Sequence, residues 1–580
     1  MRICDVATAL APLKLGPPDL EMLRPTEARY TCLLLQPSGP IFAGRQRIGQ
    51  HEPVAGALKA RQFLQLALGK HAHLAVTPEY FFPWDALKVE LLAGTQPSPG
   101  NLWVLGCESI DAPALAKFQA DVGDVCDVVH EPIAGLPADR ALFDPVVHIF
   151  QASREDGTFR LVALVQFKTC PSRDDTFFEE GLLRRGTTVY KFKGQDGTLS
   201  VSTIICSDAF ALTDAVMPEL VDRSTLIHIQ LNPDPRNSAY RQYRKTTFET
   251  DPSTSECHIV CLNWAGAVVQ HGETGPLETW PKVAGSAWYC PDSRCKSDDE
   301  IVLPNHDLGL YYAYMQERRH ALLFDYGEAA FELQIPKVVT RGKAVLANKN
   351  GPGAVERYCW NPGASAWAPG TRPVNAGFEA LLRGNPEALA ALSHATQNGS
   401  PLDTERLLAL TVGSANGMES WFSAKEVDSC RIGADEVVKR VTVAQDNHAD
   451  AVSFRYARIE SAAELRHLLD TKTDWPPQLA GVAKDSLIHW SANDPHFNVR
   501  TSDGRPSLIV NLGNAPEPRR LENTASKFVE LLRKAGGHHK DRLCIVYRRL
   551  GELKFAQLPS TRFDDALGDE TDLLAVQPLE

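Results

Sequence analysis

Three apolar, strand-like runs each end on a residue that could take part in covalent catalysis. In chain order they read H-L-A-V-T-P-E, L-V-A-L-V-Q-F-K and L-S-V-S-T-I-I-C, and they end on Glu79, Lys168 and Cys206. Runs of this length, rich in β-branched residues and followed by turn residues, are typical of buried strands. Ligands bind at the carboxyl ends of strands in open α/β sheets, so the three residues predict one site.

The three side chains suit thiol-dependent hydrolysis. A thiolate is an effective nucleophile, and a glutamate flanked by buried aromatic residues has the raised pKa of a general base. Glu79 would therefore take the proton of Cys206. Lys168 and the backbone N–H of Ser207 would stabilise the negative charge that develops on the substrate. Tyr80, next to the base, is a second candidate for binding the substrate. Each residue alone is more often structural, and the combination carries the prediction.

The sequence around these residues resembles that of the nitrilase, or carbon–nitrogen hydrolase, superfamily, whose members carry Glu, Lys and Cys in this chain order. The matching stretches are collinear from about residue 30 to residue 287: C-L-L-L-Q-P (32–37), V-L-G (104–106), I-C-S-D (205–208), I-V-C-L-N-W-A-G (259–266) and G-S-A (285–287). The resemblance implies an α-β-β-α sandwich that commonly dimerises. It also implies a second glutamate after the lysine, and Glu179 and Glu180 are both candidates.

One position departs from the family pattern. Thr203 stands where the family usually has glycine, three residues before the cysteine. A β-branched side chain there would either narrow the pocket or repack the surrounding core. The sequence alone does not choose between these alternatives.

Composition bounds the class of protein. The chain has 580 residues, 43% hydrophobic and 23% charged, with a net charge of −12. These values indicate a globular protein with more than one domain, and the negative charge argues against nonspecific nucleic-acid binding. Thirteen cysteines without framework spacing predict a reducing, cytoplasmic environment. We find no membrane-span pattern, no phosphate-binding glycine loop and no convincing metal motif, so no cofactor and no metal are expected.

We divide the chain into four parts. Residues 1–24 are expected to form an N-terminal arm, and residues 25–345 a nitrilase-like domain. Residues 346–377, rich in proline and glycine, are expected to be a linker. Residues 378–580 are expected to form a mixed α/β or α+β domain of unknown role, helical at first. Within the first domain, the less patterned residues 111–145 suggest an insertion, and Asp156-Gly157 predicts a β-hairpin.

Two functions fit these observations. The first is a hydrolase of a small amide or nitrile that works through a cysteine thioester and forms a homodimer or a larger homo-oligomer. The second is a ligand-sensing or assembly module in which the last domain binds a protein partner. Nitrilase-like modules also occur in multidomain prokaryotic proteins, some of them linked to phage defence. Loss of function on replacing Cys206 would separate the hydrolase from the sensor.

Overall fold

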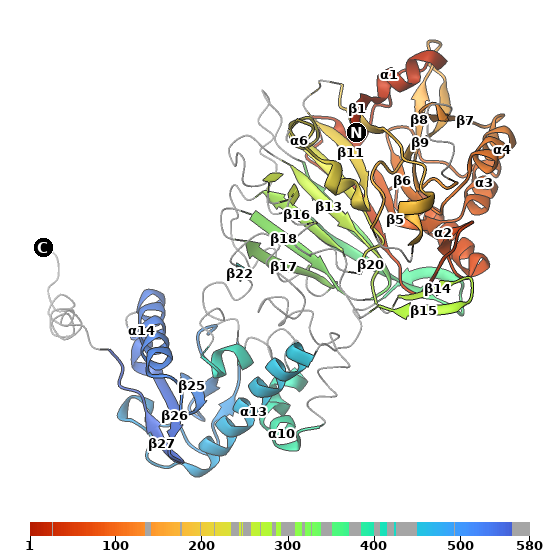
Figure 1. Ribbon diagram of the computed structural model, residues 1–580. Coiled ribbons are helices and arrows are strands. Elements are labelled where there is room, and N and C mark those ends of the chain that lie inside the picture. The colour runs from red at the N-terminus through yellow and green to blue at the C-terminus, as the bar shows by residue number, and fades with distance from the viewer. Residues whose placement is uncertain are drawn as a thin grey trace, which may run out of the picture. The chain divides into compact units, whose positions relative to one another are not determined.

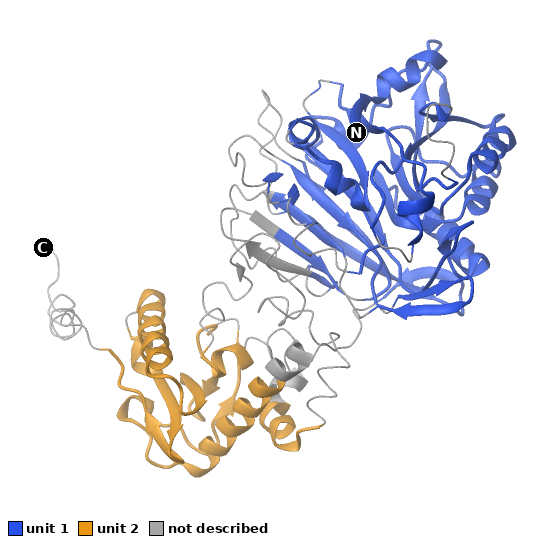
Figure 2. Cartoon of the chain, viewed as in Figure 1, with its two compact units in different colours: residues 1–374, 424–447 blue, residues 375–423, 448–580 orange. Residues whose placement is uncertain are grey.

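A computed structural model gives the fold of the chain. It describes residues 1–580 except residues 26, 134–140, 174–176, 196, 198, 214, 234–239, 241–242, 245, 248–256, 267, 281–285, 292–304, 306–307, 316–318, 326, 338–350, 371–383, 399–406, 414–422, 425–448, 492–493, 537 and 560–580. Two compact units are present (Figure 2). The first comprises residues 1–374 and 424–447, and the second comprises residues 375–423 and 448–580.

Two large mixed sheets build the first unit (Figure 1). Among the described residues, one sheet has nine strands in the order β1 (Arg2–Asp5), β10 (Thr188–Lys193), β11 (Ser200–Ile205), β12 (Ser224–Ile229), β13 (His258–Leu262), β16 (Ala287–Pro291), β18 (Arg319–Phe324), β17 (Leu310–Met315) and β22 (Ser423–Ala424). Its centre, β11-β12-β13, is parallel. Every residue of β11, β12 and β13 is buried, as expected for strands covered on both faces.

The second sheet has the order β21 (Ala366–Pro369), β20 (Gly353–Asn361), β19 (Ala329–Pro336), β2 (Arg29–Gln36), β5 (Leu74–Phe82), β6 (Leu102–Cys107), β8 (Pro145–Ser153), β9 (Phe159–Phe167) and β7 (Cys126–His130). Strands β2, β5 and β6 are parallel, and β8 pairs antiparallel with β9. The predicted β-hairpin around Asp156-Gly157 is therefore confirmed. A small sheet of β15 (Gly275–Thr279), β14 (Val269–Gly272), β3 (Pro40–Ala43) and β4 (Ile48–Gln50) completes the unit.

Helices pack on both sheets (Figure 1). Helices α2 (Pro53–Gly69), α3 (Trp84–Leu92) and α4 (Ala112–Val122) lie side by side on the second sheet, where Phe63, Leu64 and Phe118 enter one apolar core. Helix α6 (Met217–Val221) packs on β12 of the first sheet. Among the described residues of this unit, the other short helices are α1 (Val6–Leu10), α5 (Glu179–Leu182) and the 3₁₀ turns η1 (Ala11–Leu13), η2 (Glu21–Leu23) and η5 (Cys206–Ala211). This is the expected α-β-β-α sandwich.

Buried polar bonds fix how the two sheets face each other. Gln166 on β9 donates its side-chain amide to the Thr203 carbonyl (2.8 Å) and accepts from the Tyr190 backbone N–H (3.0 Å). His148 on β8 contacts the Thr203 hydroxyl at 3.0 Å. Buried polar groups are stable only when paired, so these bonds hold β9 and β11 in one relative position. The Thr203 side chain lies between the sheets, which answers the question left open by the sequence: it repacks the core.

The expected N-terminal arm is wrong. Residues 2–5 form β1, which pairs in parallel with β10 from Arg2 opposite Thr188 to Asp5 opposite Lys191. Asp5 then caps α1 by accepting from the Ala7 backbone N–H at 2.9 Å. The segment is an edge strand and a capped helix because ladder and cap bonds satisfy its backbone.

The predicted linker is also wrong over the residues that the structure describes. Strands β20 and β21 pair antiparallel with each other, and β20 pairs with β19, so residues 353–369 extend the second sheet. Trp360 and Trp367 face each other across this pair with ring centroids 5.3 Å apart. Residues 346–350 and 371–377 of the predicted linker lie outside the described residues. Likewise, residues 111–145 contain α4 and β7, which are regular parts of the sandwich.

The second unit has its own sheet, in the order β23 (Leu487–Ile488), β24 (Val499–Arg500), β25 (Pro506–Asn514), β26 (Leu543–Arg549) and β27 (Glu552–Phe555). Helix α14 (Pro518–Ala535) joins the parallel strands β25 and β26 and buries Phe528 and Leu532. Helices α10 (Pro386–Asn398) and α13 (Ala449–Thr471) precede the sheet, with short turns η8 (Pro477–Leu479) and η9 (His539–Arg542). The two longer helices thus come before the strands in the sequence.

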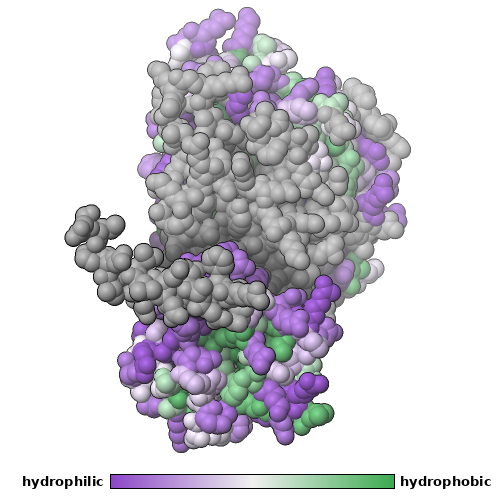
Figure 3. All heavy atoms as spheres, turned by 90° about the vertical axis from the view of Figure 1, so that its left-hand side faces the viewer, coloured by the Kyte–Doolittle hydropathy of each residue, from purple (hydrophilic) through white to green (hydrophobic). Residues whose placement is uncertain are grey.

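The surface of the second unit is mixed in polarity. On the face shown in Figure 3, hydrophobic side chains gather in one area of this unit and hydrophilic ones border it. Among its described residues, the large apolar side chains most exposed to solvent are Leu389, Tyr456, Leu487 and Leu550. In the described part of the chain, no helix has both the length and the apolar character that crossing a bilayer requires.

Candidate active site

Glu79 is delivered by β5, all of whose residues are buried. The strand bends at this point: Tyr80 has φ +59°, and the register with β6 shifts between Thr77 and Phe82. Oε2 of Glu79 accepts from the Leu231 backbone N–H, and the Trp264 indole N–H donates to the Glu79 carbonyl at 2.9 Å. Both the side chain and the backbone of Glu79 are therefore held in place.

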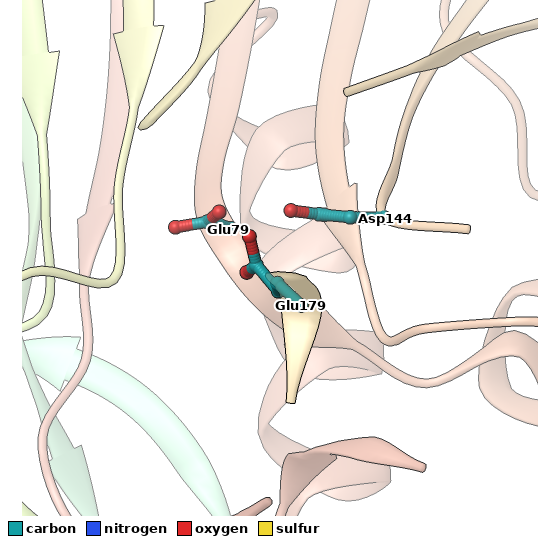
Figure 4. A group of neighbouring side chains, drawn as sticks. All are labelled: Glu79, Asp144 and Glu179. Carbon is teal, nitrogen blue, oxygen red and sulfur yellow. The ribbon is translucent and has the colours of Figure 1, made fainter. Parts of the chain in front are cut away.

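Lys168 follows the last residue of β9 and is fully buried. Its ammonium lies 2.7 Å from Glu79 Oε1, 2.8 Å from Glu179 Oε2 and 3.1 Å from Asp144 Oδ2. Figure 4 shows the three carboxyl groups pointing toward one another from β5, from the residue before β8, and from α5. One buried cation thus joins three buried acids.

The choice between Glu179 and Glu180 is decided by geometry. Glu179 opens α5 after Phe178, whose φ of +59° turns the chain inward, and it is 3% exposed. Its carboxylate accepts from the Tyr80 hydroxyl (2.8 Å), the Ser172 backbone N–H (2.6 Å) and Lys168. Glu180 is exposed and lies 3.7 Å from Arg185. The structure therefore brings Glu179, and not Glu180, to the lysine.

Cys206 follows β11 and opens η5 with φ +39°, a left-handed conformation that is unusual for a residue with a side chain. Its thiol lies 3.5 Å from the Tyr240 hydroxyl. Its carbonyl oxygen lies 2.8 Å from His228 Nε2, while the Tyr243 hydroxyl lies 2.6 Å from Nδ1. A carbonyl can only accept, so Nε2 carries the proton; burial lowers the pKa of His228 to about 3 and keeps it neutral. The turn is fixed by its neighbours.

Asp208 ties the turn of the cysteine to the turn of the lysine. Its Oδ1 accepts from Thr169 N (2.7 Å), Thr169 Oγ1 (2.8 Å) and Cys170 N (3.0 Å), and its Oδ2 accepts from Ile205 N (3.1 Å). Burial raises the pKa of Asp208 to about 6, while these hydrogen bonds oppose the rise. Because Thr169 follows Lys168 and Ile205 precedes the cysteine, this one carboxyl group links the ends of β9 and β11.

Ser207 and Tyr80, the expected oxyanion or substrate-binding residues, have different surroundings. The Ser207 hydroxyl donates to the Cys170 carbonyl at 2.6 Å. Its N–H lies in the first turn of η5, where backbone donors have no acceptor within the helix. Tyr80 lines the pocket, and its hydroxyl is bonded to Glu179. The side chain of Ser207 is therefore structural, and Tyr80 supports the second glutamate.

A pocket with a cavity volume of about 140 Å³ brings the predicted residues together. It is lined by Glu79, Tyr80, Lys168, Ser172, Phe177, Glu179, Cys206, Leu231, Asn232, Pro233 and Tyr240. The acid, the ammonium and the thiol thus share one small concave site. Phe177 and Tyr240, which the sequence did not single out, form part of its wall.

The electrostatics of the pocket follow from burial. Burial raises the pKa of Glu79 above its usual 4.5, with Lys168 opposing and Glu179 adding to the shift. Burial also raises the pKa of the Cys206 thiol well above 9.0, and Glu79 adds to this more than Lys168 opposes it. The charge of Lys168 by itself lowers the pKa of the thiol, but burial outweighs this effect. The resting thiol is therefore neutral and needs a base.

The carboxyl groups of Glu79, Asp144 and Glu179 are spaced like metal ligands, with oxygens within 4.8 Å of one another. The ammonium of Lys168 lies in contact with all three. A divalent ion in the same place would meet this positive charge at close range. The cluster thus already holds its cation, and the residues do not fit a metal centre.

Asp144 is the residue that sequence reasoning missed. Residues of β8 and β9 pair so that Pro145 lies opposite Phe167, and the next pair outward is Asp144 with Lys168, whose backbone N–H donates to the Asp144 carbonyl at 2.8 Å. The signal was available: continuing the predicted hairpin around Asp156-Gly157 outward places Asp144 beside the lysine.

No protein-family model matches the chain, and no curated protein matches it. Similar solved structures include a glutamine-dependent NAD⁺ synthetase from Acinetobacter baumannii (14% identity, TM-score 0.30, covering 68% of this chain and 59% of that one). They also include an amidase of the nitrilase superfamily from Nesterenkonia AN1 (9%, 0.25, 60% and 92%) and a glutamine-dependent NAD⁺ synthetase from Cytophaga hutchinsonii (7%, 0.27, 95% and 68%).

The nitrilase superfamily, which the sequence resembles, is thus represented among the similar structures. The chain spans 59% of the length of the Acinetobacter synthetase. With TM-scores of 0.30 or less, these likenesses assign no activity. The function proposed below rests on the site of this chain.

We expect Gly106→Ala to destabilise the site, because a Cβ at Gly106 would meet the Pro78 carbonyl oxygen at 2.1 Å. That atom is backbone next to Glu79 and cannot move aside, so we expect a loss of about 1–3 kcal/mol of unfolding free energy, measured by urea titration. Gly69→Ala is the control, since it has open space at the end of α2; it should match or exceed the wild type. Equal stability of both variants would contradict the close packing at Gly106.

Asp208→Ala should uncouple the two turns, because it leaves the donors of Thr169, Cys170 and Ile205 without their acceptor. We expect unfolding free energy to fall by about 3 kcal/mol, the scale of several buried unsatisfied donors. Asp208→Asn should lose less, since its amide oxygen can still accept from Thr169 and Cys170. Chemical denaturation of the two variants tests this order, and the reverse order would disprove the linking role.

Proposed function

We propose that this protein hydrolyses a carbon–nitrogen bond of a small amide or nitrile through a thioester on Cys206. One observation carries the proposal: Glu79 from within β5, Lys168 from the end of β9 and Cys206 from the end of β11 line the same pocket. A neutral thiol that shares one pocket with a buried carboxylate and a fixed ammonium provides the groups that acyl transfer to sulfur requires.

The first half of the reaction follows from these groups. Glu79 takes the proton of Cys206 as the sulfur attacks the amide carbonyl carbon, since the resting thiol does not ionise by itself. The negative charge that develops on the carbonyl oxygen is stabilised by Lys168 and by the backbone N–H of Ser207. Glu79 then gives its proton to the nitrogen, the C–N bond breaks, and ammonia or an amine leaves.

The second half regenerates the thiol. Glu79 takes a proton from a water molecule, whose oxygen attacks the thioester carbon. The C–S bond breaks, the acid product leaves, and Cys206 recovers the proton from Glu79. A nitrile enters the same route after attack of the sulfur on the nitrile carbon, and one added water releases its nitrogen as ammonia to give the thioester.

The pocket limits the size of the substrate. Its cavity of about 140 Å³ is close to the engineered cavity of roughly 150 Å³ that holds one benzene molecule. The reacting part of the substrate should therefore have about six non-hydrogen atoms. Tyr240 and Phe177 supply apolar surface, whereas Asn232 offers a polar side chain.

Incubation with small amides, nitriles and ureido acids should produce an acyl adduct on Cys206, released ammonia, or both, as seen by intact-protein mass spectrometry. Cys206→Ala should abolish both signals. Cys126→Ala is the matched control, because Cys126 is also buried but lies on β7 outside the pocket, and it should keep both. Turnover that survives in Cys206→Ala would rule out the thioester route.

The fall of kcat/KM at low pH should report the pKa of Glu79. A base accepts a proton only when ionised, so kcat/KM must fall as the pH drops through the Glu79 pKa, which burial raises above its usual 4.5. We expect the midpoint of this fall to lie above pH 4.5 in steady-state assays of the wild type. Full activity retained below that value would contradict the role of Glu79 as base.

A further inference from the structure

Asp144 stands in the centre of the charged cluster without touching the pocket. Its side chain is fully buried, with Oδ2 at 3.1 Å from the ammonium of Lys168, and its backbone carbonyl accepts from the Lys168 N–H. Its carboxyl oxygens approach those of Glu79 and Glu179 within 4.8 Å. The mechanism above gives Asp144 no task, although a buried acid beside the base must affect that base.

The charges of this cluster do not balance if every acid is ionised. Glu79, Asp144 and Glu179 would bring three negative charges against the one positive charge of Lys168. Uncompensated charge in a buried site is costly, and like-charged carboxyl groups at this range prefer to keep a proton among them. At least one of the three acids therefore holds a proton in the resting protein.

Hydrogen bonding identifies which acid holds it. Glu79 accepts from Lys168 and the Leu231 backbone N–H, and Glu179 accepts from Lys168, the Tyr80 hydroxyl and the Ser172 backbone N–H. Donors aimed at a carboxylate favour its ionised form.

The surroundings of Asp144 differ from those of the two glutamates. Among the described residues, neither oxygen of Asp144 has a hydrogen-bond donor aligned on it, and the ammonium is its only close cation. A carboxyl group without donors but next to a carboxylate is the better place for the proton. As a protonated acid, Asp144 would supply an O–H donor to the carboxyl groups it faces.

We propose that Asp144 is a positioning residue of the hydrolase: it stays protonated and lends that proton to Glu79 as a hydrogen bond, so that Glu79 rests ionised and oriented as the base. The inference depends on the function proposed above. The neutral Asp144 lowers the negative charge around Glu79, and the shared hydrogen bond stabilises the carboxylate that must accept the proton of Cys206.

The surroundings of Asp144 also favour its protonated form. Burial raises the pKa of Asp144 well above its usual 3.8; Lys168 opposes the rise, and the carboxylates of Glu79 and Glu179 add to it. The ionisable side chains that face Asp144 from the surrounding elements are Lys168, Glu79, Glu179, Tyr80 and Cys107.

Three forms of the protein test the proposal: the wild type, D144N and D144A. The amide of D144N is neutral, similar in shape to a protonated aspartic acid, and able to donate to Glu79. D144A can donate nothing. We expect D144A to lose at least about tenfold in kcat/KM and to shift the acid limb upward by about one pH unit, whereas D144N recovers most of the loss and leaves the limb in place.

An ionised Asp144 gives the opposite pattern. Replacing a negative charge with the D144N amide would then lower the Glu79 pKa and move the acid limb downward, by about one pH unit. That result, or equal losses in D144N and D144A, would overturn the proposal. Thermal unfolding of both variants identifies a loss that comes from misfolding.

An infrared measurement separates this proposal from the proposed hydrolysis. At neutral pH the wild type should show the carbonyl band of a buried protonated carboxyl group, and D144N should lack it. If the band is present while every amide and nitrile stays intact, the hydrolase has failed and the protonation of Asp144 stands. If turnover is present and the band is identical in D144N, the proton is not on Asp144.

Discussion

The ammonium of Lys168 is the group on which the rest of the site depends. A lysine buried this fully would lose its charge if it stood alone. Burial does lower the pKa of Lys168, but the acids around it, Glu179 and Glu79 above all, outweigh this effect and raise the pKa well above its usual 10.5. The pairing is mutual, because each acid is tolerable in the core only beside this cation. Removing the lysine would leave the acids uncompensated.

The fold of the first unit brings the reacting side chains into one pocket. Glu79, Lys168 and Cys206 arrive from β5, β9 and the turn after β11, so two sheets must keep a fixed relation. Gln166 and Asp208 provide it: Gln166 bonds across the sheet interface, and Asp208 links the turn after β9 to the end of β11. Both lie within two residues of a reacting side chain, which makes the position of the thiol relative to the base a property of the core.

The sequence predicted those parts of the site that are encoded locally. The β8–β9 hairpin has its own turn signal, and the runs that end on Lys168 and Cys206 end where β9 and β11 do. The run at Glu79 was predicted to end there, but β5 continues to Phe82 through the bend at Tyr80. The choice between Glu179 and Glu180 depends on the inward turn at Phe178, and phenylalanine at that position does not predict a turn. Asp144 was missed because the register of the hairpin was not followed to its end.

The two errors in the fold have a common physical origin. Strand β1 is four residues long, too short to show an alternating pattern, and it forms because β10 offers a free edge. Strands β20 and β21 lie at the edge of the other sheet, and most of their residues are exposed or half-buried. Proline and glycine in this segment give it the composition of a linker. Edge strands are specified by their partners more than by their own residues.

The charge of Lys168 is the most direct test of this account. Nitrogen NMR of protein labelled with ¹⁵N-lysine, with Lys168 assigned through Lys168→Arg, reports whether its side chain is an ammonium or an amine. The account predicts an ammonium at neutral pH, held by the three carboxyl groups against the effect of burial. A neutral amine would show that burial lowers the pKa of Lys168 more than the acids raise it. Lys168 could then neither compensate the charge of the buried acids nor stabilise a developing negative charge.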